Sequence, residues 1–330
     1  MSSRSDMGMI IRLKPVFKRM VWGGSRMREE FGYEIPGDDT GECWAISAHE
    51  HGDCIIDGGV FDGRTLSWLW EHHKELFTEN TEGAADLNGS SRFPLLTKII
   101  DARQDLSIQV HPDDAYAYEH ENGAKGKTEC WYVLDCDPDA TIVIGHNAHS
   151  KDELKAMVGE GRWKDLIREI PIHKGDFFQI FPGTMHAIKG GTMILETQQN
   201  SDITYRVYDY GRLVNGAARE LHLKQALDVI KVPFEPDAAF DTGEALFTEG
   251  GALCTPLVSC NRYQVWRIEN NGKARMEHNE PYLLCSVISG QGSIDGEAVG
   301  KGDHFILADG YRAFTLEGRI EMICSTGRKV

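Results

Sequence analysis

The sequence lacks any apolar run long enough to span a lipid bilayer. Its first residues, MSSRSDMGMIIRLKP, also lack the long apolar segment of a secretory signal. None of its eight cysteines forms a Cys-x-x-Cys pair, and most lie within apolar stretches, which is typical of buried reduced thiols. We therefore expect a cytoplasmic protein without a disulfide framework.

Positive charge is also scarce. The 330 residues include 35 Lys and Arg against 51 Asp and Glu, which gives a formal net charge of -16. This balance disfavours nucleic acid and anionic membranes as partners, so a phosphorylated small substrate would need a locally basic pocket. The apolar fraction of 41% supports an ordinary globular core, and the length is sufficient for two domains.

Candidate metal ligands occur in three separate blocks, SIQVHPDD, KTECWYVL and FPGTMHAI. The blocks supply an amide oxygen, a carboxylate and two imidazoles, from Gln109, Glu129, His111 and His186. This mixed nitrogen and oxygen set suits a zinc-class divalent ion and leaves room for a substrate oxygen. A metal-binding protein that uses the ion in its chemistry is therefore indicated.

The spacing of these ligands predicts that they converge. If residues 107–111 form a strand, Ser107, Gln109 and His111 share one face and the apolar residues between them share the other. Glu129 precedes the aromatic and β-branched run WYVL, and His186 follows a Pro-Gly turn. Any one histidine alone is more often an ordinary hydrogen-bonded residue. Polar residues at several inward strand positions of a small β-barrel favour a site.

The remaining sequence predicts a mainly β protein with a few helices. Short strands are expected at 10–13, 43–46 and 55–56, and helices at 66–77, 151–167 and 218–230, the second beginning with a Ser150 and Glu153 capping box. Between 232 and 251 the periodicity is lost, which marks a boundary. We expect a metal-binding domain with helical segments over residues 1–240 and a second β-barrel over 241–330.

The two halves share a short sequence motif, HKGDF at 173–177 and VGKGDHF at 299–305, which indicates an internal duplication. Where the first half continues with FPGTMH at 181–186, the second has ADGYR at 308–312. The counterpart of His186 is therefore missing. The second half is expected to be structural rather than catalytic.

The blocks SIQVHPDD, KTECWYVL, GDFFQIFPGTMHAI and LETQQNSDITYRVYDYGR resemble those of type I mannose-6-phosphate isomerases, in particular the short bacterial form. The segments VWGG at 21–24 and GECWAIS at 41–47 resemble the same family, so the resemblance covers essentially the whole chain. It implies two cupin-like (jelly-roll) β-barrels, with helical insertions in the N-terminal half and a degenerate C-terminal barrel.

The resemblance also implies one Zn2+ per chain, or another divalent ion, bound by Gln109, His111, Glu129 and His186. An amide is a weak ligand, so Gln109 is alternatively a hydrogen-bonding neighbour of the metal or of the substrate. The partner would be a small hexose phosphate. The sequence leaves open whether the chain forms a homo-oligomer.

The implied reaction is the interconversion of mannose 6-phosphate and fructose 6-phosphate through a cis-enediol. This chemistry needs a group that moves a proton between C1 and C2 and a cation that stabilises the developing negative charge. Lys127, Asp202 and Glu196 are candidates for the proton transfer, and a cation beside Lys127 would favour its neutral amine.

Arg206 is the strongest candidate for an essential residue, because arginine binds phosphate through paired donors. Its alternative is a salt bridge with Asp202 or Asp209. Ser107, Lys98 and Arg212 are further candidates for substrate or phosphate binding. Two other functions remain open at this point: a sugar-phosphate-binding cupin without turnover, and a metal-dependent cupin oxygenase, which would not need phosphate-binding arginines.

Overall fold

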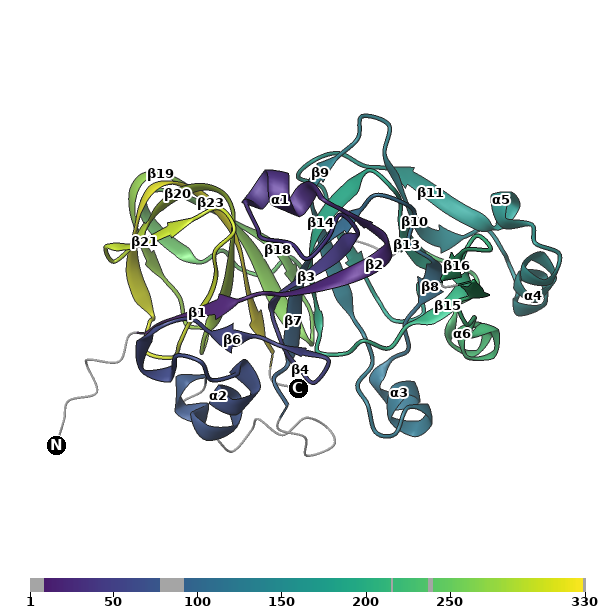
Figure 1. Cartoon of the computed structure of the whole chain (residues 1–330), viewed down its shortest axis with the longest axis horizontal. Coiled ribbons are helices and arrows are strands. Elements are labelled where there is room, and N and C mark those ends of the chain that lie inside the picture. Colours follow the sequence, from purple (N-terminus) through teal and green to yellow (C-terminus); the bar gives the residue numbers. More distant parts are fainter. Residues whose placement is uncertain (1–8, 78–91, 215, 237–239, 329–330) are drawn as a thin grey trace.

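The computed structural model describes residues 9–77, 92–214, 216–236 and 240–328. They form a mainly β protein, as the sequence predicts (Figure 1). The helices are short: α1 (Arg26–Phe31), α2 (Leu66–His72), α3 (Asp114–His120), α4 (Lys151–Gly159), α5 (Trp163–Leu166) and α6 (Leu223–Val229), with 3-10 turns η2 (Gly59–Phe61) and η3 (Lys74–Leu76). Within these described ranges, no helix has the length and apolar character needed to cross a membrane.

Two antiparallel sheets build the N-terminal half. The six-stranded sheet has the order β12-β9-β14-β7-β2-β3, and the five-stranded sheet has the order β11-β10-β13-β8-β15. The first contains β2 (Val16–Gly24), β3 (Thr40–Ile46), β7 (Leu95–Ala102), β9 (Glu129–Cys136), β12 (Phe177–Ile180) and β14 (Thr192–Gln199). The second contains β8 (Ile108–Val110), β10 (Thr141–His146), β11 (Ile167–Pro171), β13 (His186–Ile188) and β15 (Tyr205–Tyr208).

An apolar core joins these two sheets face to face. Trp131 and Ile194 of the six-stranded sheet pack there with Ile142 and Ile188 of the five-stranded sheet. The other face of the five-stranded sheet is covered by helices, because Ile108 and Val110 belong to a core shared with α4 and α6. Since neighbouring strand residues point to opposite faces, Gln109 points toward the six-stranded sheet. The alternation predicted for residues 107–111 is therefore confirmed for β8.

The C-terminal half forms an eight-stranded sheet with the order β18-β19-β23-β20-β22-β1-β6, in which β21 also pairs with β20. Its strands are β18 (Phe247–Ser259), β19 (Tyr263–Glu277), β20 (Leu283–Ile294), β21 (Glu297–Gly300), β22 (His304–Leu307) and β23 (Ala313–Gly327). The first strand of the chain, β1 (Ile10–Lys14), pairs with β22, and β6 (Ile55–Ile56) pairs with β1. The second barrel thus takes two strands from the N-terminal region, and the limits 1–240 and 241–330 stay a prediction.

The two barrels pack directly against each other. Ile99 and Leu195, on the outer face of the six-stranded sheet, share a core with Val265 and Ile323 of the second barrel. The six-stranded sheet is consequently covered on both faces. This explains why every residue of β7 is buried and why its sequence does not alternate between apolar and polar residues.

The predicted helices are present but shorter than expected. The helix predicted over 66–77 ends at His72 and is followed by η3, and the helix predicted over 218–230 begins only at Leu223. The helix predicted over 151–167 ends at Gly159, and the chain turns through Gly161 with a φ of 67° before α5. Ser150 caps α4 as predicted, but Glu153 accepts from the backbone N–H of His149 and not from that of the cap residue.

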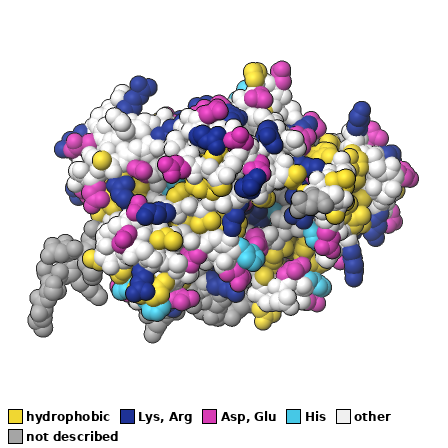
Figure 2. Space-filling view, viewed as in Figure 1, with side chains coloured by type: hydrophobic (Ala, Val, Ile, Leu, Met, Phe, Trp, Pro, Cys, Tyr) yellow, Lys and Arg dark blue, Asp and Glu magenta, His cyan; other side chains and the backbone are white. Residues whose placement is uncertain are grey.

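Two short hairpins, β4–β5 (Ala48–His49 and Gly52–Asp53) and β16–β17 (Leu213–Val214 and Ala217–Ala218), complete the described strands. Acidic and basic side chains are mixed across the face of the molecule shown in Figure 2. On this face the net negative charge is therefore spread among cations and does not form one continuous acidic surface.

Candidate metal centre and its surroundings

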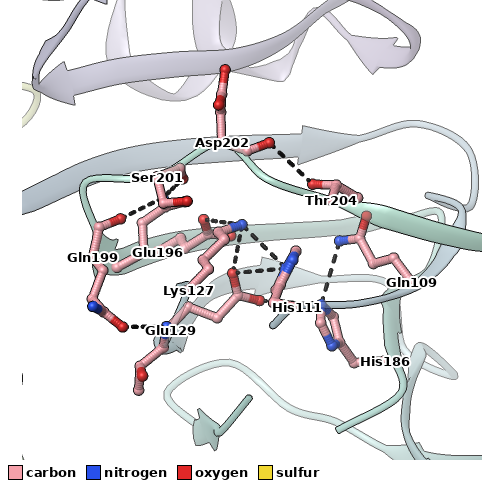
Figure 3. Close-up of polar contacts among 12 residues, drawn as sticks. Gln109, His111, Lys127, Glu129, His186, Glu196, Gln199, Ser201, Asp202 and Thr204 are labelled. Carbon is pink, nitrogen blue, oxygen red and sulfur yellow. Dashed lines mark hydrogen bonds and ion pairs between the residues drawn. The ribbon is translucent and has the colours of Figure 1, made fainter. Parts of the chain in front are cut away.

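Three of the predicted metal ligands lie together inside the first barrel (Figure 3). Glu129 begins β9, His186 begins β13 and His111 follows β8, so both sheets contribute. The Nε2 atoms of His111 and His186 each lie 3.4 Å from one oxygen of the Glu129 carboxylate. All three side chains are at most 1% exposed, and their ligand atoms lie within 4.8 Å of one another.

Backbone carbonyls orient both imidazoles for metal binding. Nδ1 of His111 lies 2.8 Å from the carbonyl oxygen of Ile203, and Nδ1 of His186 lies 2.8 Å from that of Thr184. A carbonyl only accepts hydrogen bonds, so Nδ1 carries the proton in each ring and Nε2 keeps a free lone pair. Burial lowers the pKa of both histidines, that of His111 to about 3, which keeps the rings neutral.

Gln109, the fourth predicted ligand, lies at the edge of this triad. It pairs with His186 in the register of β8 and β13, and its Nε2 lies 3.4 Å from Nε2 of that histidine. Rotation of the amide would turn its oxygen to the same position, and an amide oxygen is a suitable donor for a divalent ion. The position of Gln109 therefore fits either a ligand or a neighbour that contacts the substrate.

The residues present fit a divalent cation. The Glu129 carboxylate is buried, and no described residue donates a hydrogen bond to its Oε1. Two neutral imidazoles and one carboxylate form a donor set typical of zinc sites that keep a position open for substrate. His111, Glu129 and His186 could therefore hold a metal, with Gln109 as the fourth ligand.

A buried network of lysines and glutamates adjoins the triad. Lys127 Nζ lies 2.7 Å from Oε2 of Glu129 and 3.6 Å from Oε1 of Glu196. Lys98 Nζ lies 3.1 Å from the same Glu196 oxygen and 3.9 Å from Oε2 of Glu42. Three carboxylates thus face two ammonium groups, and a divalent ion would turn one excess negative charge into one excess positive charge. The network can therefore attract both a cation and, once the cation is bound, an anionic substrate.

The two glutamates beside Lys127 have opposite pKa shifts. Burial opposes ionisation of Glu129, but the positive charge of Lys127 outweighs it and holds the pKa of this carboxyl group well below its ordinary value. Burial and the nearby negative charge of Glu129 raise the pKa of Glu196. A carboxylate that stays ionised beside one that takes up a proton more readily is the combination that acid–base chemistry uses.

Of the predicted phosphate ligands, Arg206 lies on the adjoining strand β15, and Arg212 lies in the loop that follows it. Arg206 pairs with Gln109 in the register of β15 and β8, and cross-strand partners share a face of the sheet. Asp209 is held by Arg212 at 2.9 Å and by Arg219 at 2.6 Å, and no ion pair joins Arg206 to an acid within the described ranges. Nε of Arg206 and Nη1 of Arg212 are buried and have no described acceptor. Buried guanidinium donors without an acceptor are the groups that an anion would satisfy.

The other predicted residues fall into two groups. Ser107 and Lys98 are buried beside the centre, Ser107 directly before β8 and Lys98 in β7. Asp202 lies apart from the triad: its carboxylate contacts His51 at 2.5 Å and is 41% exposed. Among the described contacts, none joins Asp202 to Lys127 or Glu196.

Sequence reasoning missed Glu42 and Arg219. Glu42 lies within the GECWAIS segment and accepts a hydrogen bond from Trp44 Nε1 at 2.7 Å while it faces Lys98. Glu42 directly precedes the apolar strand predicted at 43–46, and an acidic residue at this position was a signal that could have identified it. Arg219 follows an exposed hairpin, and nothing local in the sequence distinguishes it from a solvated arginine.

Comparisons with known proteins agree with this geometry. Residues 10–144 match the catalytic domain of type I phosphomannose isomerase, and residues 256–327 match the mannose-6-phosphate isomerase cupin domain. The chain is 49% identical over 317 residues to mannose-6-phosphate isomerase ManA of Bacillus subtilis, covering 94% of this chain and 97% of that protein.

Mannose-6-phosphate isomerase of Streptococcus mutans is 46% identical over 318 residues, covering 95% of this chain and 96% of the relative. The crystal structure of the mannose 6-phosphate isomerase from Bacillus subtilis superposes with a TM-score of 0.90 at 46% identity, covering 96% of this chain and 99% of that one. Nearly full-length identity, the cupin architecture and the buried triad all agree, and the chain therefore belongs to the type I phosphomannose isomerase family.

Proposed function

We propose that this chain interconverts mannose 6-phosphate and fructose 6-phosphate by moving a proton between C1 and C2 through a cis-enediol. The observation that carries the proposal is the buried His111, Glu129 and His186 triad beside Lys127 and Glu196. The relatives from Bacillus subtilis and Streptococcus mutans bear the name of this activity and span almost the whole chain. The proposal includes a cytoplasmic location, which the sequence favours.

We infer that one zinc-class ion binds His111, Glu129 and His186, with Gln109 as the fourth ligand. Such an ion would supply Lewis-acid stabilisation of the negative charge that develops on the oxygens of C1 and C2. The protein's part is to keep both histidines neutral and fixed by the carbonyls of Ile203 and Thr184. This preorganisation places charge stabilisation where the enediol forms.

Lys127 and Glu196 are our assignment for the proton transfer. One of them takes the proton from C2 of the open-chain aldose while the carbonyl oxygen on C1 gains a proton, which gives the enediol. A proton is then added to C1 while the hydroxyl group on C2 loses its proton, which gives the ketose. Glu196 has a raised pKa, which suits a carboxyl group that alternately holds and releases a proton. Asp202, the third predicted candidate, is better explained by another role, since its carboxylate contacts histidines and not this pair.

Arg206 and Arg212 are assigned to the phosphate, because each has a buried guanidinium nitrogen without a described acceptor. Two arginines can bind phosphate through several charge-assisted hydrogen bonds. Arg219 donates to both oxygens of Asp209, at 2.7 and 2.6 Å, and Arg212 donates to one of them through Nη2, which leaves Nη1 of Arg212 for the phosphate. Ser107 and Lys98 would contact sugar hydroxyls between the phosphate and the metal.

The test is a coupled assay for conversion of mannose 6-phosphate to fructose 6-phosphate. Purified protein is assayed as isolated, after treatment with a chelator, and after Zn2+ is restored. We expect activity that disappears with the metal and returns with it. A zinc-loaded protein without activity that still binds mannose 6-phosphate would instead support a sugar-phosphate-binding cupin.

A further inference from the structure

A second group of histidines and a carboxylate lies outside the triad. His49 and His51 belong to the β4–β5 hairpin, and Asp202 belongs to the connection between β14 and β15. Nδ1 of His51 lies 2.5 Å from Oδ2 of Asp202, and Nε2 of His49 lies 3.7 Å from its Oδ1. The contact therefore joins two segments that are about 150 residues apart in the sequence.

The hydrogen bonds of His49 argue against a second metal centre, although the ligand atoms of the three residues lie within 4.8 Å of one another. The backbone N–H of His51 donates to Nδ1 of His49 at 3.1 Å. The proton of the neutral ring therefore resides on Nε2, the atom that faces Asp202, and leaves no lone pair there for a metal. This is the reverse of His111 and His186, whose Nδ1 atoms face carbonyls.

The hairpin side of this contact is well fixed. His49 is 9% exposed, and its ring packs edge-on against Trp44 with centroids 5.6 Å apart. The ammonium group of Lys18 contacts the backbone carbonyl of His51. The side chain of His51 is 64% exposed and that of Asp202 is 41% exposed, so the buried His49 is the fixed part of the hairpin and the carboxylate is the part that is held.

The connection that carries Asp202 also carries the hydrogen-bond partner of a metal ligand. The next residue, Ile203, accepts the Nδ1 proton of His111 through its carbonyl oxygen. On the inner side, Ser201 holds the connection by donating to the carbonyl of Lys125 at 3.0 Å. On the other side, Asp202 contacts His51 of the β4–β5 hairpin. Ile203 is the next residue in the chain, so this contact also restrains its position.

We propose that His49, His51 and Asp202 form a clamp that positions Ile203, and through its carbonyl the metal ligand His111. Asp202 is then a positioning residue and not a catalytic one. The proposal rests on the metal site of the proposed function. The clamp would act on the ion through two groups, the carbonyl of Ile203 and the ring of His111. Loss of hydrogen-bonding partners behind metal ligands commonly lowers metal affinity about 10- to 100-fold.

The test measures the Zn2+ dissociation constant by competition with a chromophoric chelator, which needs no substrate. Asp202→Ala, which removes both histidine contacts, should weaken Zn2+ binding about tenfold, the low end of that range because the clamp acts indirectly. His51→Leu should weaken it less, and His51→Asn, which keeps an N–H donor near the position of Nδ1, should restore most of the affinity.

His173→Leu is the matched control, since Nδ1 of His173 also lies 3.7 Å from an aspartate, Asp176, in a turn that meets β9 at Val133, four residues along the strand from Glu129. Unchanged Zn2+ affinity in both Asp202→Ala and His51→Leu would overturn the clamp. Loss of turnover in Asp202→Ala with wild-type Zn2+ affinity would also overturn it and return Asp202 to the reaction itself. A wild-type protein that binds zinc but does not isomerise contradicts the proposed function alone.

Discussion

The two barrels share a local framework but differ in the side chains placed on it. Asp176 in the first barrel accepts a hydrogen bond from the backbone N–H of His173 at 2.7 Å, and Asp303 in the second accepts one from Gly300 at 2.8 Å. Each turn leads into a short strand, β12 or β22, that pairs with a longer one, β9 or β20. The repeated motif thus forms the same structure twice, which supports the predicted duplication.

This correspondence locates the counterparts of the metal ligands. Glu129 pairs with Ile180 in the first barrel, and Leu283 pairs with Leu307 at the same distance from the shared turn in the second. By the same count, Ala313 stands where His186 stands. Leu283 belongs to a core of apolar residues that fills the second barrel. Similar strand geometry therefore gives a polar site in one barrel and a packed core in the other, because function depends on a few side chains.

The most severe test of this difference converts the first barrel toward the second with Glu129→Leu. The variant should lose bound zinc, and its turnover should fall at least about a thousandfold, since several kcal/mol of charge stabilisation would be lost. Metal analysis and the coupled assay on the same preparation check this. Glu129→Gln, which keeps the shape, should behave similarly, and full activity in either variant would remove Glu129 from the site.

The reciprocal change, Leu283→Glu, should not create a metal site, because Ala313 offers no imidazole. A carboxylate buried in this apolar core without a partner should lower the free energy of unfolding by about 3 kcal/mol or more. Denaturant unfolding measures the loss. Zinc binding by this variant would show that strand position alone is sufficient.

The second test concerns the arginines of the first barrel. Arg206→Ala should lower kcat/KM for mannose 6-phosphate about 30- to 1000-fold, equivalent to about 2–4 kcal/mol, because a partly buried charged partner of the phosphate is removed. Bound zinc should remain, since arginine is not a ligand. Arg275→Ala is the control: this residue of β19 pairs with Glu277 in the second barrel and should leave both properties unchanged. Loss of zinc from Arg206→Ala would contradict our assignment of its role.

The third test concerns His304, a buried histidine of the second barrel whose pKa is lowered as that of His111 is in the first. Burial lowers the pKa of His304 to about 3, as it does for His111, but the neighbours of His304 are Tyr33 and Ser286. Its pKa lies below the unfolded value of about 6.5, so between these values the unfolded chain binds more protons and stability falls as the pH falls. From pH 7 to pH 5 the expected contribution of His304 is a loss of about 2 kcal/mol.

Denaturant unfolding of the metal-free protein at both pH values measures this loss. His304→Gln cannot titrate, so its stability should change less with pH by about that amount. The exposed His173 serves as a control, since His173→Gln should retain the wild-type pH dependence. An equal pH dependence in wild type and His304→Gln would show that His304 takes up a proton in the folded state.

Much of this comparison could be predicted from the sequence. The parts that could not be predicted depend on contacts that no local sequence pattern indicates. The strands, the triad and the missing histidine of the second barrel follow from local patterns such as the alternation of Gln109 and His111. The pairing of β1 with the second barrel does not, because it depends on packing between segments about 300 residues apart. The contact of Asp202 with His51 was missed for the same reason, since these residues are 151 positions apart. Arg219 lies only 10 residues from its partner Asp209, and it was missed because it looks like a solvated surface arginine in the sequence.

The smallest expected effect tests whether the repeated turn is equally important in both barrels. Asp176→Ala and Asp303→Ala each remove one side-chain acceptor from a backbone N–H and should each lower the free energy of unfolding by about 1 kcal/mol. Asp303 also lies 3.5 Å from Arg12 of β1, but this partly exposed ion pair should add only a few tenths of a kcal/mol. Denaturant unfolding of both variants and of the double variant gives the comparison. Because the two turns lie in different barrels, the two losses should add, and a much larger loss for Asp303→Ala would mean that its contact with Arg12 secures β1 in the second barrel.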